Sequence, residues 1–266
     1  MSSSWIQVAN EALKIPGLLI EVYGDLARPG VRQVGKALET VIGLGNTALW
    51  PVAWANERSR IALERNLEKY RKALESVPEE KIVAVAPEIG VPVAEKLEYV
   101  REDRLADLYV HLLASASTVD RLSVAHPSFV NVINNLSPDE AVLLEFFKTA
   151  TDLPFVQPTA VIPASGAFTN FGGPVVQAKT LANLVFPQNL GAYLENLAGL
   201  GLVRVHDDKW LTDNPVYAEL EALHRPGITA VFANIPRFKD NELQFGRGFV
   251  QRTSFGANFI AACHAQ

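Results

Sequence analysis

The chain has 266 residues, of which 48% are hydrophobic and 20% are charged, and its formal net charge is −5. This composition is too apolar for a disordered chain, and the negative charge argues against a generally basic nucleic-acid binder. The single cysteine, Cys263, excludes a disulfide framework within the chain and fits a reducing compartment. The N-terminal stretch has no basic n-region and breaks at Pro16, so a secretory signal is not expected. We therefore expect a cytoplasmic protein.

Residues 29–50 predict an amphipathic helix. Apolar residues recur on one arc at helical spacing, whereas Arg32 and Lys36 lie on the opposite side. Pro29 suits the first helical position, because its missing N–H would have no partner there in any case. Arg32 and Lys36 are therefore candidate interaction residues.

The end of this helix could also meet a membrane. No charged residue lies between Glu39 and Glu57, and Trp50 and Trp54 occupy the place of interfacial aromatic residues. The uncharged run is at the short limit for spanning a bilayer. Three interpretations remain open for residues 29–55: a span, a helix lying on the surface of the inner membrane, and a helix packed on the protein. Trp50 and Trp54 are candidate interaction residues in the second case.

The rest of the first 152 residues predicts a helical domain. Residues 57–77 carry a seam with alternating spacings of four and three, which indicates packing against another helix. A further helix is expected over about 92–119. The seam residues of the first of these helices are Leu63, Leu67, Tyr70, Leu74 and Val77.

The segment "HPSFVNVINNLSPDE" predicts two helix starts. His126 precedes Pro127 at the first start, where the imidazole can cap or pack locally, and Phe129 is expected in the core. Ser137 and Glu140 have the spacing of a capping box at the second start. We favour this structural role for His126 over proton transfer, but keep His126 and Phe129 as candidate interaction residues.

A change in composition follows at residue 153. Residues 153–180 are rich in Pro and Gly, and predict an irregular segment. Residues 181–266 predict a winged-helix-like region with a small β-sheet: a helix, a glycine stop, a strand and a hairpin turn at "HDDK". Two more strands, "ITAVFANI" and "FGRGFVQRT", and a short helix complete it. The fold class is mainly α, of the α+β type, with an N-terminal helical bundle before this region.

The sequence contains no recognisable catalytic, metal or nucleotide motif. The five histidines have no metal-ligand spacing, and the glycine pairs lack the strand and lysine of a phosphate loop. We therefore expect no cofactor and no metal and favour a non-enzymatic role, while an enzyme whose site converges only in the fold remains open. Arg247 and Arg252 are candidates for contacts with nucleic acid, although the predicted recognition helix carries no Lys or Arg.

The segment "LADLYVHLLASASTVDRLSVAHPSFVNVINNLSPDEAVLL" resembles the core of the abortive infection alpha (Abi-alpha) family. Residues 23–54 are similar to that family's N-terminal part, and "SFGANFIAACHAQ" to its closing piece. The resemblance implies a bacterial protein that takes part in phage defence, in which infected cells stop growing or die. It implies no catalytic residue.

Two functions follow from these observations. The first is a non-enzymatic abortive-infection effector or sensor that acts through an unknown protein partner or through the membrane. The alternative is a winged-helix-type regulator that binds nucleic acid.

Overall fold

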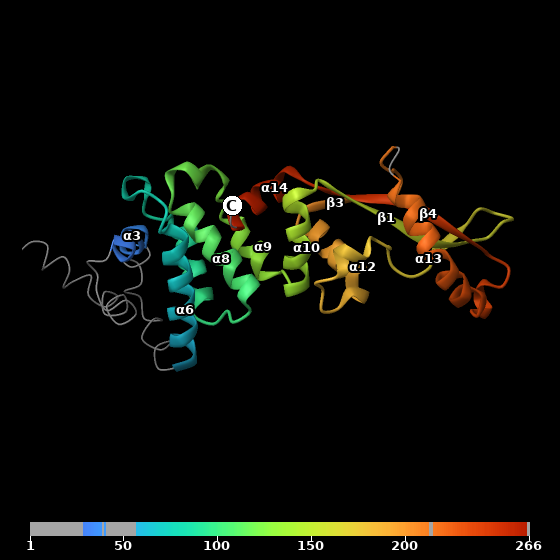
Figure 1. Cartoon of the computed structure of the whole chain (residues 1–266), viewed down its shortest axis with the longest axis horizontal. Helices are drawn as coiled ribbons and strands as arrows, with labels where there is room; N and C mark the ends of the chain where they lie inside the picture. Colours follow the sequence, from blue (N-terminus) through green and yellow to red (C-terminus); the bar gives the residue numbers. More distant parts are fainter. Residues whose placement is uncertain (1–28, 39, 41–56, 213–214, 265–266) are drawn as a thin grey trace, which may run out of the picture. The chain divides into compact units, whose positions relative to one another are not determined.

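The computed structural model describes residues 29–38, 40, 57–212 and 215–264. The described part is mainly helical with one small antiparallel sheet, which confirms the predicted fold class (Figure 1). The chain divides into two compact units, residues 1–136 with 258–266 (unit 1) and residues 137–257 (unit 2). Helix α14 (Ser254–Cys263) begins in unit 2 and ends in unit 1.

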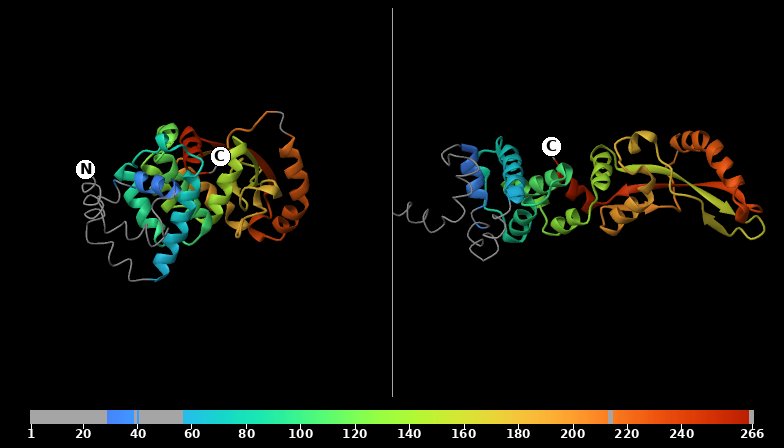
Figure 2. Two further views of the ribbon diagram at one scale, coloured as in Figure 1. Left: turned by 60° about the vertical axis from the view of Figure 1, so that its left-hand side comes forward. Right: turned by 90° about the horizontal axis from the view of Figure 1, so that it is seen from below.

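Unit 1 is built from helices. Helix α8 lies against both α6 and α7, and α3 lies against α6 (Figures 1 and 2). The described elements are α3 (Pro29–Ala37), α6 (Glu57–Leu74), η1 (Glu79–Lys81), α7 (Pro87–Leu97), α8 (Asp103–Ala116), η2 (Val119–Val124) and α9 (Ser128–Asn134). Helix α3 covers the first part of the predicted 29–50 helix, and residues 41–50 lie outside the described residues.

The predicted seam of α6 is its buried face. Leu63 and Leu67 are 4% exposed, and Tyr70 and Leu74 are fully buried. The Tyr70 hydroxyl lies 2.5 Å from Ser117 Oγ, and Ser117 Oγ itself donates to a main-chain carbonyl. The tyrosine therefore donates to the serine, which satisfies both buried hydroxyl groups.

The helix predicted over 92–119 is two helices, α7 and α8, because the chain turns between Leu97 and Asp103. The Glu102 side chain accepts the Leu105 N–H at 2.9 Å and so caps the start of α8. Such a cap satisfies an N–H that has no partner within the helix.

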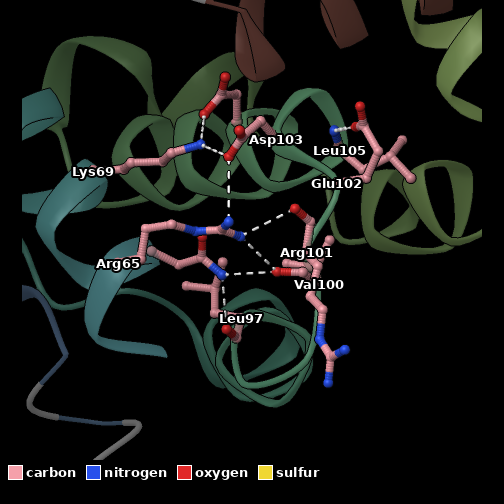
Figure 3. A network of polar contacts seen from close by, with 10 residues as sticks. Arg65, Lys69, Leu97, Val100, Arg101, Glu102, Asp103 and Leu105 are labelled. Carbon is pink, nitrogen blue, oxygen red and sulfur yellow. Dashed lines mark hydrogen bonds and ion pairs between the residues drawn. The ribbon is translucent and has the colours of Figure 1, made fainter. Parts of the chain in front are cut away.

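Side chains of α6 hold this turn in place (Figure 3). Lys69 Nζ lies 2.8 Å from a carboxylate oxygen of both Asp103 and Asp107. Arg65 donates to the carbonyl of Val100 at 3.1 Å. These contacts join α6 to the turn and to the start of α8. The charged side chains of this network therefore have a structural role.

The end of α14 completes the core of unit 1. Phe259 is fully buried and meets Phe129 edge to face, with ring centroids 5.3 Å apart. Ser115 Oγ donates at 2.7 Å to the carbonyl of Ala262, a residue 147 positions away in the sequence. The small side chains at the end of α8 allow this close approach.

Unit 2 combines helices with the sheet, whose strand order is β2-β1-β4-β3 with all pairs antiparallel. The long strands β1 and β4 run side by side with α13 next to them (Figure 1). Its elements are α10 (Pro138–Thr149), β1 (Asp152–Val161), β2 (Phe168–Asn170), α11 (Ala178–Leu181), η3 (Pro187–Asn189), α12 (Leu190–Gly199), β3 (Val203–His206), α13 (Val216–Ala233), η4 (Pro236–Phe238) and β4 (Glu242–Arg252).

Strand β1 occupies residues 152–161, where the Pro content predicts an irregular segment, and this part of the prediction is wrong. Val156 exchanges main-chain hydrogen bonds with Val175, on the side of β1 away from β4. Pro154 and Pro158 share this orientation, because the direction of the N–H alternates along a strand. Neither proline therefore removes a hydrogen bond from the β1–β4 ladder.

Two further details of the C-terminal prediction are wrong. Residues 228–233 are the end of helix α13 and not a strand, since Phe232 packs there against Phe238 and Ala160. The segment "HDDK" is not a hairpin turn, because β3 pairs with β4 only after α13 has intervened. The strand and the short helix predicted near the C-terminus are present as β4 and α14.

The predicted glycine stop ends α12. Gly201 has a φ of 77°, and the N–H groups of Gly201 and Leu202 bond back to Ala198 and Leu197. This is the pattern of a Schellman motif, in which glycine adopts the left-handed conformation at little cost. The winged-helix-like interpretation of the whole region stays a prediction.

Candidate functional site

The residues predicted as a possible membrane contact are only partly described. Lys36 is exposed and donates to the carbonyl of Glu79 at 3.1 Å. The side chain of Arg32, and Trp50 and Trp54 altogether, lie outside the described residues. Across the part of the chain that the structure describes, no helix combines the length and apolar character needed to cross a bilayer.

His126 and Phe129 lie at the start of α9 in different environments. His126 is exposed, and its Nδ1 accepts the N–H of Ser128 at 3.1 Å, as a local capping role requires. Phe129 is 1% exposed and belongs to the core of unit 1. The ring of Phe129 is therefore not a surface contact, whereas a partner contact through His126 stays a prediction.

Arg247 and Arg252 do not form a shared basic surface. The side chain of Arg252 donates to the carbonyl of Phe147 and so ties β4 to the end of α10. The guanidinium of Arg247 lies over the ring of Tyr217 of α13, with its Cζ 5.7 Å from the ring centroid. One arginine is thus engaged in the fold, and the other lies on the face of the sheet that α13 covers.

The "LSPDE" segment joins α10 to the region before α12. The capping box of Ser137 and Glu140 is present, as predicted. Asp139 is 3% exposed and accepts three hydrogen bonds, from the N–H groups of Val185 and Phe186 at 2.8 Å and from the Tyr193 hydroxyl at 2.9 Å. The pKa of Tyr193 is raised, first by desolvation and then by its hydrogen bond to this carboxylate.

Glu140 adds a second link between the same elements. One of its oxygens accepts the Ser137 N–H at 2.6 Å, and the other accepts the side-chain amide of Asn196 of α12 at 2.7 Å. The helix dipole accounts for an acidic first turn, but not for these distant partners. Asp139 and Glu140 are structural residues that position α12 beside α10.

The open face of the sheet in unit 2 forms the best candidate site, a groove with a volume of about 510 Å³ that we call the sheet groove. Its floor is the face of β1 and β4 that α13 does not cover, and α12, β2 and the end of β3 form its sides. Side chains at alternate positions of β1 line the floor. The lining includes Phe155, Gln157, Thr159, Phe168, Glu195, Val205, Asp207 and Gly246.

Apolar and polar groups are mixed in the sheet groove. Phe168 is 69% exposed and Val205 is 38% exposed, so both offer apolar surface to a ligand. Gln157 donates its amide N–H to the carbonyls of Pro158 and Gly172, which leaves its oxygen as an acceptor. Mixed linings of this kind are typical of ligand sites.

The charge of the sheet groove is negative. Glu195 and Asp207 are exposed, and neither forms an ion pair with any residue that the structure describes. Arg247 is the one described cation at the groove, and its guanidinium lies on the opposite face over Tyr217. The groove therefore suits a ligand that carries a positive charge.

The sheet groove was missed in the sequence because its residues come from five elements without a common motif. The alternation of Phe155, Gln157, Thr159 and Val161 was the available indication, but it required residues 152–161 to be recognised as a strand. A composition rich in proline concealed that strand.

Among the residues that the structure describes, Cys263 and the possible metal ligands do not form a site. Cys263 is buried, and burial raises the pKa of its thiol well above the ordinary value, which disfavours the nucleophilic thiolate. Among the described residues no group of three or more His, Cys, Asp and Glu side chains could hold a metal ion.

The described fold is of the mainly helical α+β class, and comparison with known proteins identifies its family. The model of the family described as abortive infection alpha matches residues 62–263. The chain belongs to this family, which supports a role related to abortive infection.

Two other comparisons add little. No curated protein matches the chain. A solved structure of an uncharacterized protein from the hydrocarbon-degrading marine bacterium Alcanivorax borkumensis SK2 is 16% identical, with a TM-score of 0.33. The match covers 53% of this chain and 92% of that one. A similarity at this level supports no conclusion about the present chain.

Proposed function

We propose that this chain acts in abortive infection as an effector or sensor that binds a protein partner through the sheet groove. Family membership supports the defence role. The groove supports the binding role, because its lining includes exposed apolar side chains and two carboxylates that form no ion pair with a described residue. That open, mixed surface is the observation that carries the proposal.

The proposal is tested by filling the groove. A Cβ added at Gly246 would lie 3.6 Å from the Gln157 carbonyl oxygen, which is ordinary contact, so Gly246→Trp places its ring over the floor with little strain. Gly227→Trp is the matched control, because Gly227 is exposed on α13 outside the groove and an added Cβ meets nothing within 4 Å.

The variants are expressed in a susceptible bacterium, and culture density is followed after phage challenge at low and high phage load. We expect the wild type and Gly227→Trp to protect at low load and to collapse at high load. Gly246→Trp should lose protection although it is folded by circular dichroism. Full protection by folded Gly246→Trp would show that the groove is not the functional surface.

A further inference from the structure

One edge of the sheet in unit 2 is open beside the sheet groove. Strand β3 pairs with β4 only from Phe249 to Arg252, since His206, its last residue, lies opposite Phe249. Residues 242–248 of β4 pair with β1 on their other side. On the β3 side of this stretch, no residue that the structure describes continues the ladder.

The direction of each main-chain group in β4 follows from one hydrogen bond. The N–H of Arg252 donates to the carbonyl of Thr151, on the side of β1. Because this direction alternates along an antiparallel strand, the even-numbered residues of β4 face β1. Leu243, Phe245 and Arg247 therefore direct their N–H and C=O groups toward the open edge.

The sheet groove reaches this same edge. Phe245 and Arg247 both line the groove. Their side chains lie on the opposite face, where Phe245 packs in the cluster of α13 and Arg247 lies over Tyr217. These two residues thus meet the groove through their main chain, and the groove offers unpaired peptide groups along one side.

We propose that the sheet groove binds an extended segment of a partner protein, which adds to the sheet as a strand along residues 243–247 of β4. This inference rests on the proposed function and names its binding mode. Main-chain hydrogen bonds to an open edge supply affinity, and pockets for alternate side chains supply specificity. An unprotected edge of this kind is a ready template for another strand.

The groove also specifies the chemistry of that segment. Side chains at alternate positions of the added strand project from the same face of the sheet that forms the floor of the groove. Beside the open edge the groove is lined by Val205, which is 38% exposed, and by Asp207, whereas Phe168 lines its far end. Because Glu195 and Asp207 both line the groove and the guanidinium of Arg247 lies on the opposite face, we expect the segment to carry a lysine or an arginine. The expected ligand is therefore an extended segment with at least one basic side chain on the groove face.

The test uses a library of random ten-residue peptides displayed on a carrier and selected on the full chain. We expect enrichment of extended sequences that carry a lysine or an arginine, without proline at the alternate positions that pair with β4. Enrichment of acidic or helical sequences, or no enrichment at all, would overturn the proposal. The most enriched peptide is then synthesised, and titration calorimetry measures its affinity for the wild type and for variants at positions 195, 207 and 247.

Proline at position 247 separates main-chain from side-chain effects. Arg247→Pro removes an N–H that faces the open edge and leaves the β1 ladder intact, as Pro154 and Pro158 do in β1. Arg247→Ala is the reference, because it removes the same side chain but keeps the N–H. We expect Arg247→Pro to bind the peptide at least about tenfold more weakly than Arg247→Ala. Equal affinities would rule out strand addition.

The carboxylates are tested with the same peptide. The double variant Glu195→Gln and Asp207→Asn should weaken binding about tenfold, and binding should become less sensitive to salt. Unchanged affinity and salt dependence would show that the basic side chain is not recognised here.

The phage assay separates this inference from the proposed function. In one outcome, Arg247→Pro abolishes peptide binding while folded Gly246→Trp still protects fully. Strand addition is then supported, and its role in defence is rejected. Loss of protection by Gly246→Trp, with equal peptide affinities of Arg247→Pro and Arg247→Ala, would keep the groove and reject strand addition. The proposal of a separate partner would also be rejected if the only ligand were a peptide from the chain's own residues 1–28 or 41–56, or a second copy of the chain.

Discussion

At the scale of single residues, the strongest prediction concerns the buried carboxylate of Asp139. Its carboxylate accepts three hydrogen bonds while it is 3% exposed. Asp139→Ala leaves these donors without an acceptor, so we expect the free energy of unfolding of unit 2 to fall by about 3 kcal/mol. Asp139→Asn keeps one acceptor oxygen and should cost about 1–2 kcal/mol. Urea denaturation followed by circular dichroism measures both losses.

Asp120→Ala is the control for this series. Asp120 forms an exposed ion pair with Lys81 at 2.7 Å, and such pairs contribute less than about 1 kcal/mol. If Asp139→Ala costs no more than Asp120→Ala, the buried carboxylate does not hold α10 to the segment before α12.

The residue scale also shows what local sequence reveals. The capping box of Ser137 and Glu140 was predictable because both partners lie within one turn of the same helix. The second partner of Glu140, Asn196, was not predictable, because it belongs to another helix 56 positions away. The capping box thus explains one of the two partners of the Glu140 carboxylate, and none of the hydrogen bonds that the Asp139 carboxylate accepts from Val185, Phe186 and Tyr193.

At the scale of elements, two glycines of β4 give opposite predictions. A Cβ at Gly248 would overlap the ring of Phe155 and lie 2.5 Å from the carbonyl oxygen of His206, which is main chain and cannot move aside. Gly248→Ala should therefore destabilise unit 2 by about 2 kcal/mol or more. Gly246→Ala meets only ordinary contacts and should be neutral or slightly stabilising.

Thermal unfolding of the two alanine variants measures this difference directly. The pair is well matched, because both changes add one methyl group to the same strand and the two positions have the same orientation in the ladder. A similar melting temperature for both would show that Phe155 and the end of β3 do not pack over Gly248 as described.

Elements also show where sequence patterns are ambiguous. The prolines of β1 concealed a strand, because their effect depends on which side of the strand the partner occupies, and only the register supplies that information. The β-branched residues near position 230 suggested a strand, but packing of Phe232 against Phe238 and Ala160 stabilises them in a helix. Tertiary contacts decided both cases against local preference.

At the scale of the whole molecule, the candidate site is a product of topology. The sheet groove draws on β1, β2, β3, β4 and α12, so its residues are dispersed through much of unit 2. Its open edge exists because β3 is four residues long while β4 has eleven. Neither property has a linear motif. The sequence supplied the family and the helical bundle, whereas the groove required the strand order and register.

The division into two units leads to a prediction about α14, which begins in unit 2 and ends in unit 1. Phe259 is fully buried against Phe129 in unit 1, although it follows β4 directly in the sequence. Phe259→Ala removes this ring contact, and we expect a loss of about 3–5 kcal/mol in unit 1. In native-state hydrogen exchange, the amides of α8 and α9 should lose protection, while those in the middle of β1 and β4 keep theirs.

Phe168→Ala is the control for that experiment, because Phe168 is 69% exposed and its removal should leave protection unchanged in both units. An equal loss of protection in β1 and β4 on Phe259→Ala would show that the whole chain opens as one cooperative body. Selective loss in unit 1 would instead show that the helical core depends on residues that follow unit 2 in the sequence. In that case the core of unit 1 can form completely only after synthesis of unit 2 has finished.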